Sequence, residues 1–114
     1  MVPESQAAAT MPACRIVSAI AAAVDLPVSV KMRRGLRNGS RDCLTVGPLL
    51  IEAGASVLTL HPRSAEQMYT GTADHTLTAE LVSLVEKPVI ASGDITSRAR
   101  AQAVLATTGA AAVM

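Results

Sequence analysis

The sequence predicts an α/β fold in which short parallel strands alternate with helices. Three observations lead to it. Short runs of apolar, often β-branched residues recur along the chain, a stretch of helical periodicity follows each complete run, and the apolar content is aliphatic. Half of the 114 residues are hydrophobic, yet there is one Tyr and no Phe or Trp. Ala, Val, Leu and Ile suit strands that helices cover, so we expect one domain with a parallel sheet.

The expected elements alternate regularly after a loose lead-in. Pro12 is expected to open the first helix, because proline fits the first helical position. Gly47-Pro48 is expected to kink the second helix or delay its start. Thr76 is expected to cap the third helix, and Thr96 or Ser97 the fourth. In order, we expect a lead-in over 1–11, a helix over 12–24, a strand over 28–32, a basic loop over 33–41, a helix over 42–53, a strand over 57–61, a polar loop over 62–76, a helix over 77–86, a strand over 88–92, a helix ending before Gly109, and a strand over 111–114.

Charge is balanced overall but uneven along the chain. The formal net charge is +1, which by itself indicates no polyanionic partner. Five basic residues nevertheless gather within eleven positions, namely Lys31, Arg33, Arg34, Arg37 and Arg41. This cluster is either a solvated basic loop or an edge that binds phosphate or nucleic acid.

The remaining composition narrows the class of protein. Cys14 and Cys43 fit neither a metal-binding spacing nor a redox motif, and we expect both to be reduced. Residues 1–10 lack the pattern of a signal peptide, and Ala19 to Ala23 is too short to span a bilayer. We therefore expect a cytoplasmic protein with no membrane segment and no metal site.

Polar or titratable residues follow each complete strand. Lys31 and His61 end the first two strands, and Ser92-Gly93-Asp94 follows the third. Function in parallel α/β folds collects at the carboxyl ends of the strands. Taken singly, the lysine suits a solvated charge, the histidine a satisfied partner of a backbone group, and the Gly-Asp pair an ordinary turn. Taken together, the three positions favour a binding rim.

Four segments resemble motifs of one family. Residues 27–35 (Pro-Val-Ser-Val-Lys-Met-Arg-Arg-Gly) are similar to the strand 5 motif of bacterial tRNA-dihydrouridine synthases. Leu60-His61-Pro62-Arg63-Ser64 is similar to their strand 6 motif, residues 67–74 to the loop that follows it, and residues 88–95 to their strand 7 motif. The order and the gaps match too. The resemblance covers about residues 12–114 and implies part of a TIM (β/α)8 barrel, roughly strands 5 to 8 with their helices.

The resemblance also implies chemistry. In the family, FMN is reduced by NADPH, and the reduced flavin passes a hydride to C6 of a uracil in tRNA. Lys31 and His61 correspond to residues that contact the isoalloxazine ring. Ser92-Gly93-Asp94 corresponds to a flavin-lining turn in which relatives have Asn in place of Ser92. The positions that meet tRNA or shape the uracil pocket are Arg33, Arg34, Arg63, Gln67 and Tyr69.

Some family features are not found in these 114 residues. The Gly-Cys-Pro motif with the catalytic cysteine is expected before Met1, so no catalytic residue is assigned, and neither Cys14 nor Cys43 takes that role. The Gly-Arg pair that binds the FMN phosphate is expected beyond Met114. His75 replaces a usual Trp, which is expected to weaken the packing of its loop. The isolated chain is therefore expected to be inactive and to self-associate through open sheet edges. The alternatives are a non-catalytic truncated remnant and another flavin- or phosphate-binding barrel.

Overall fold

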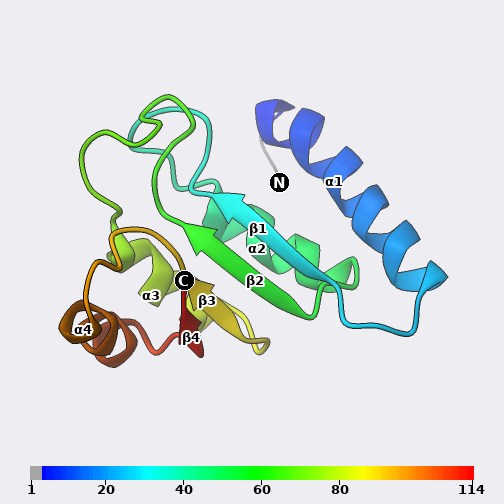
Figure 1. Ribbon diagram of the computed structural model, residues 1–114. Coiled ribbons are helices and arrows are strands. Elements are labelled where there is room, and N and C mark those ends of the chain that lie inside the picture. Colours follow the sequence, from blue (N-terminus) through cyan, green and yellow to red (C-terminus); the bar gives the residue numbers. More distant parts are fainter. Residues whose placement is uncertain (1–3) are drawn as a thin grey trace.

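The computed structural model describes residues 4–114, with side chains from Thr10 onward. Helices and strands alternate, and the four strands form one parallel sheet in the order β1-β2-β3-β4 (Figure 1). The predicted α/β fold with parallel strands is confirmed. The elements are α1 (Glu4–Ala23), β1 (Ser29–Arg33), α2 (Cys43–Glu52), β2 (Val57–His61), α3 (His75–Leu84), β3 (Val89–Ala91), α4 (Arg98–Thr108) and β4 (Ala112–Val113).

The core lies on one face of the sheet. Leu58 and Leu60 of β2 and Val89 of β3 are fully or almost fully buried, and they belong to one cluster with Leu50, Leu77 and Leu81 from the helices. Gly47 of α2 makes this packing close, because a Cβ added there would come within 2.7 Å of Leu81 Cδ1 and 3.3 Å of Leu58 Cδ1. A larger residue at position 47 would force the Leu81 side chain to shift within the packed core.

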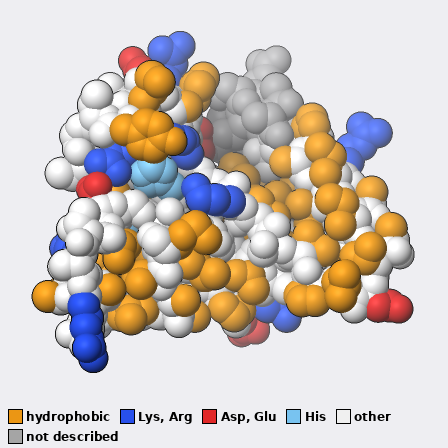
Figure 2. Space-filling model, in the orientation of Figure 1, with side chains coloured by type: hydrophobic (Ala, Val, Ile, Leu, Met, Phe, Trp, Pro, Cys, Tyr) orange, Lys and Arg blue, Asp and Glu red, His pale blue; other side chains and the backbone are white. Residues whose placement is uncertain are grey.

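The other face of the sheet carries no helix among the described residues (Figure 1). Side chains of a strand alternate between faces, so the residues between the core positions point to this side. They include Lys31 of β1, Thr59 and His61 of β2, and Ile90 of β3. Figure 2 shows a histidine on the surface with Lys and Arg side chains around it. We call this side of the sheet the inner face.

Two expected helix starts, those of the first and third helices, differ from the structure. The first helix begins at Glu4 and not at Pro12, which lies inside it. The run of Ala residues before Pro12 has high helix propensity, so the expected lead-in is helical from residue 4 on. The second helix begins at Cys43, next to the expected start at 42, so of the two alternatives at Gly47-Pro48, a kink or a late start, the late start is wrong.

The third helix begins at His75 and is capped by Asp74, not by Thr76. The Asp74 carboxylate accepts hydrogen bonds from the backbone N–H and the hydroxyl of Thr76. A carboxylate accepts strongly and suits the positive end of the helix, which explains why it takes the capping position.

The fourth helix has the expected ends. Ser97 accepts a hydrogen bond from the backbone N–H of Arg100 at 3.0 Å, and Gly109 ends the helix with φ +75°. Helices long and apolar enough to cross a bilayer are absent from the described part of the chain.

Candidate functional site

The strand-end residues lie on the inner face, although Lys31 lies further from the carboxyl end of its strand than expected. Arg33 is the register partner of His61, whereas Lys31 pairs with Thr59. Lys31 and His61 therefore point to the same side, with Lys31 two residues, or about 7 Å, further into the sheet. Lys31 is exposed, and the charge of its side chain acts on His61. Ser92 follows β3, and its backbone N–H bonds to the carbonyl of Leu60 next to His61.

His61 is surrounded by positively charged side chains. Its side chain is 6 % exposed, and an Nη1 of Arg63 lies 3.3 Å from its Nε2. Burial lowers the pKa of His61 below its usual 6.5, and the charges of Arg33, Arg63 and Lys31 lower it further. The imidazole is therefore neutral at pH 7.

Arg63 links the loop after β2 to the turn after β3. Its Nε donates to the carbonyl of Thr70 at 3.2 Å, and its Nη2 donates to the carbonyl of Gly71 and to Asp94 Oδ1, each at 2.9 Å. The residue is 7 % exposed. The guanidinium that was predicted to meet tRNA or shape the uracil pocket is thus bonded within the protein. We call the set of Arg63, Asp94 and the two carbonyls the arginine clasp.

Asp94 holds the other end of this clasp. Its Oδ2 accepts the backbone N–H of Ala73 at 2.7 Å. That hydrogen bond, followed by the one from Arg63, keeps the pKa of Asp94 below its ordinary value although partial burial opposes it. Asp94 has φ +58°, a conformation that costs free energy in a residue with a side chain. The two interactions of the carboxylate offset that cost.

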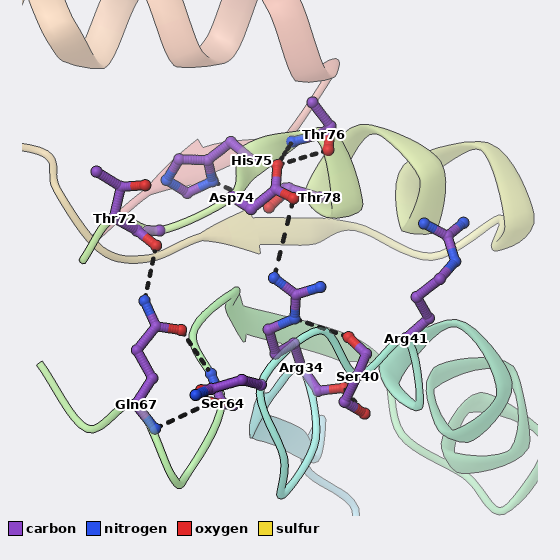
Figure 3. Close-up of polar contacts among 12 residues, drawn as sticks. Arg34, Ser40, Arg41, Ser64, Gln67, Thr72, Asp74, His75, Thr76 and Thr78 are labelled. Carbon is purple, nitrogen blue, oxygen red and sulfur yellow. Dashed lines mark hydrogen bonds and ion pairs between the residues drawn. The ribbon is translucent and has the colours of Figure 1, made fainter. Parts of the chain in front are cut away.

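Gly93 and His75 fix the same turn from two sides. Gly93 has φ +103°, and a Cβ there would lie 2.7 Å from His61 Cδ2 and 3.1 Å from Ala73 Cβ. Only glycine fits both the conformation and the space. The carbonyl of Gly93 accepts a hydrogen bond from Nε2 of His75 at 2.8 Å, and Nδ1 of His75 lies 3.0 Å from the Thr78 hydroxyl (Figure 3). His75 is therefore buried and has a polar partner at each ring nitrogen.

The loop over 62–74 is ordered by Gln67. Its side-chain oxygen accepts the backbone N–H of Ser64, and its amide donates to the carbonyls of Thr70 and Thr72 (Figure 3). Tyr69 is 76 % exposed. The guanidinium of Arg33 lies 5.4 Å from the centre of the Tyr69 ring, a cation–π contact. Of these three predicted substrate residues, Tyr69 offers the largest free surface at the rim.

The basic loop after β1 divides into bound and free arginines. Arg34 Nε donates to the carbonyl of Ser40 at 2.7 Å, and its Nη1 lies 3.9 Å from Asp74 Oδ2 (Figure 3). Its side chain is 13 % exposed, so it acts inside the loop. Arg41 forms a surface ion pair with Glu80 at 2.6 Å. Arg37 is exposed, and its side chain has no hydrogen bond or ion pair within the described residues.

A cleft of about 730 Å³ opens where this loop meets α3 and α4. It is lined by Arg34, Gln67, Asp74, Glu80 and Arg100 among others. Neither Lys31 nor His61 lines it, so it is separate from the inner-face site.

The two cysteines contribute nothing to the rim. Cys43 is 1 % exposed, and burial raises the pKa of its thiol to about 11, so it is protonated and unreactive at neutral pH. The Sγ of Cys14 lies 3.8 Å from the carbonyl of Leu49. Within the described residues no three His, Cys, Asp or Glu side chains are grouped as a metal site would require.

The pairing of Arg63 with Asp94 could not be found from the sequence. The residues are 31 positions apart, and neither occurs in a spacing that marks an ion pair. The sequence contained one indication: Arg63 and Asp94 each lie shortly after a strand. Neighbouring parallel strands bring the segments that follow them together.

Comparison with known proteins gives one consistent family. The model of the dihydrouridine synthase (Dus) family matches residues 8–114. A tRNA-dihydrouridine synthase B from Xanthomonas campestris is 41 % identical over 100 residues, which cover 88 % of this chain and 30 % of the relative. A probable tRNA-dihydrouridine synthase from Rhodobacter capsulatus is 39 % identical over 102 residues, 90 % of this chain and 32 % of the relative. The chain thus spans about a third of the length of the relatives that it matches.

Proposed function

The chain belongs to the dihydrouridine synthase family, and we propose that it supplies one part of the barrel that reduces uridine to 5,6-dihydrouridine in tRNA, with FMN as cofactor and NADPH as reductant. The observation that carries the proposal is the shared direction of Lys31 and His61. Both project from adjacent strands onto the inner face, which no described helix covers. The turn of Ser92, Gly93 and Asp94 lies beside them.

The side chains present fit a flavin ring. Lys31 is exposed on this face, and its ammonium suits the electron-rich edge of the ring, where negative charge develops on reduction. His61 is neutral, so one of its ring nitrogens can donate a hydrogen bond without a second positive charge. Gly93 lets the turn after β3 pack directly against the ring of His61, because a Cβ at this position would clash with it.

Each group then has a role in the proposed reaction. The bound flavin would supply the hydride that C6 of the uracil receives. Lys31 and His61 would bind and orient the ring. The hydrogen-bonded loop over 62–74 would exclude water from one side, and the exposed ring of Tyr69 would offer a stacking surface to a base.

The test is a chimera in which this chain replaces the matching segment of the Xanthomonas campestris relative. We expect the purified chimera to carry flavin and to form dihydrouridine in tRNA when NADPH is supplied. Lys31→Met should lower flavin content and activity together, whereas Lys87→Met, distant from the inner face, should leave both unchanged. A folded chimera that holds no flavin, or one whose flavin content is insensitive to Lys31→Met, contradicts the proposal.

The 114-residue chain by itself should behave differently. Its sheet has four strands with β1 and β4 at the edges, and a four-stranded sheet does not surround a cofactor as a closed eight-stranded barrel does. We expect it to lose FMN during gel filtration, to form no dihydrouridine, and to self-associate through its edge strands. Flavin absorbance that co-elutes with the chain would refute the first expectation.

A further inference from the structure

We propose that Arg63 is a positioning residue that decides which nitrogen of His61 carries the proton, so that Nδ1–H points to the ligand on the inner face. The assignment of that ligand as FMN rests on the proposed function, whereas the protonation state rests on the geometry of this chain alone. Arg63 then acts through His61 and not through contact with tRNA.

The first step is the chemistry of the guanidinium group. Arginine has N–H donors and no acceptor, and it keeps its proton at every physiological pH. The 3.3 Å contact between Arg63 Nη1 and His61 Nε2 is therefore a hydrogen bond only if Nε2 presents its lone pair. A neutral imidazole with an unprotonated Nε2 carries its proton on Nδ1.

The second step is that Arg63 cannot turn away. The carbonyls of Thr70 and Gly71 and the Oδ1 of Asp94 hold three of its other N–H groups, at 2.9 to 3.2 Å. The Asp94 carboxylate is itself fixed by the backbone N–H of Ala73. Because the guanidinium is planar and bonded along several edges, the N–H that faces His61 has one direction.

The third step concerns the ring of His61. A Cβ at Gly93 would lie 2.7 Å from Cδ2 and 3.0 Å from Nε2, so the turn after β3 contacts this edge of the imidazole. Nδ1 belongs to the opposite edge, and it makes no hydrogen bond to any described residue. Its N–H is available to an acceptor atom of a ligand on the inner face, such as a carbonyl oxygen or ring nitrogen of a flavin.

Protonation of His61 would oppose this arrangement. A proton on Nε2 would face the donor of Arg63, and it would add a positive charge beside Arg33, Arg63 and Lys31, with Asp94 the opposing negative group. Burial and the charges of Arg33, Arg63 and Lys31 thus keep the ring neutral, and the hydrogen bond from Arg63 orients it, as a positioning residue for a hydrogen-bond donor must do.

The second histidine provides an internal reference. Nε2 of His75 lies 2.8 Å from the carbonyl of Gly93, and a carbonyl only accepts. His75 therefore carries a proton on Nε2, and in the neutral ring Nδ1 accepts from the Thr78 hydroxyl at 3.0 Å. The chain has two histidines, and the structure assigns them opposite tautomers.

The test is nitrogen NMR of the full chain labelled with ¹⁵N-histidine at pH 7.5, with His61→Gln used to assign the two rings. We expect a protonated Nδ1 and an unprotonated Nε2 for His61, and the reverse for His75. A His61 ring with its proton on Nε2 overturns the inference, and the wild-type spectrum alone is enough to show it.

Two variants separate the hydrogen bond from the charge. Arg63→Met removes both, and we expect His61 to shift toward the Nε2–H tautomer that free imidazole side chains favour, while His75 keeps its own. Lys31→Met removes one charge that lowers the pKa of His61 but no hydrogen bond to the ring, so the pKa should rise while Nδ1–H persists. An unchanged His61 tautomer in a folded Arg63→Met protein contradicts the role of Arg63.

The flavin is tested apart from the tautomer. In the chimera with the Xanthomonas campestris relative, flavin binding should shift the Nδ1 resonance of His61 and leave those of His75 in place. If the wild-type chain shows the expected tautomer but the chimera binds no flavin, the role of Arg63 stands and the proposed function fails. If flavin binds without affecting Nδ1, the donor role of His61 toward it is wrong.

Discussion

The loops after β1 and β2 both carry arginines at the same rim, yet they use them in opposite ways. In the loop after β2, Arg63 is 7 % exposed and holds two carbonyls, a histidine and a carboxylate. In the loop after β1, Arg37 is exposed and its side chain contacts no other described group through a hydrogen bond or ion pair. Residue type therefore does not decide the role of an arginine here. The number of residues between the arginine and the strand end decides its role. The first residues of such a loop are covered by the neighbouring turn.

Arg34 supports this rule from within the basic loop. It follows β1 directly and is largely buried, with bonds to Ser40 and a longer ion pair to Asp74. Arg37 and Arg41, further along, lie at the surface. The basic cluster seen in the sequence thus contains a structural part close to the strand and a solvated part away from it.

The largest expected effect follows from breaking the arginine clasp. Arg63→Met removes the side-chain donor of Asp94 Oδ1 and of the carbonyls of Thr70 and Gly71, and leaves Asp94 with the backbone N–H of Ala73 alone. We expect the free energy of unfolding to fall by about 2–3 kcal/mol, since Asp94 keeps some solvent access and the loss stays below that of a fully buried pair. Urea denaturation measures it. Arg37→Met is the matched control and should change stability by less than about 0.5 kcal/mol. Equal effects for the two variants would show that the two loops do not differ.

Two glycines provide the next comparison. Gly93 in the turn after β3 and Gly39 in the basic loop both have positive φ, +103° and +78°. A Cβ at Gly39 meets nothing within 4 Å, whereas one at Gly93 meets His61 and Ala73. We expect Gly39→Ala to cost about 1 kcal/mol from backbone strain alone, and Gly93→Ala about 2–3 kcal/mol because the clash adds to it. Thermal unfolding of both variants checks the order, and a Gly39→Ala protein that is the less stable one would contradict it.

A smaller effect is expected from pH, and it arises at the rim and not in the basic loop. The pKa of His61 is lower in the folded state than its usual 6.5, so below that pH the unfolded chain binds a proton before the folded one does. Stability should therefore decline as pH falls below about 6.5. Asp94 and Asp74 have lowered pKa values, and the stability that they contribute should be lost below about pH 4. His61→Gln should flatten the first decline in urea titrations at several pH values; an unchanged slope would remove His61 as its source.

The sequence predicted the sheet well because each strand is a local feature. The apolar runs at 57–61 and 88–92 and the caps at Ser97 and Gly109 depend on residues close in the chain. The start of α1 was missed because Pro12 suggested a helix start, whereas the preceding Ala run continues the helix across it. The candidate site was predicted as a group of strand ends. The contacts within the site were not predicted. Arg63 bonds to Asp94 and His75 bonds to Gly93, and these partners lie 31 and 18 positions apart in the sequence.

The smallest expected effect concerns tRNA. The sequence left open whether the basic loop over 33–41 is a solvated loop or binds nucleic acid, and we now expect that its solvated part faces the RNA backbone. In the chimera with the Xanthomonas campestris relative, Arg37→Ala should weaken tRNA binding slightly. It should also lower the slope of log affinity against log salt by about 0.7–0.9, as expected for one lost phosphate contact. Flavin content should stay constant, because the side chain of Arg37 bonds to no group at the rim.

Arg34→Ala is the informative partner of that variant. Its guanidinium holds the carbonyl of Ser40, near the start of α2. Loss of the guanidinium should disturb the loop and lower flavin content or stability. Any change in the salt dependence of tRNA binding would then follow from that disturbance. If Arg34→Ala changed only the salt slope and Arg37→Ala changed nothing, the buried arginine would be the RNA contact. The distinction between covered and solvated arginines would then fail. Each variant is made separately in the same chimera. A salt series of tRNA affinity for both, with flavin absorbance read on the same samples, decides between these outcomes.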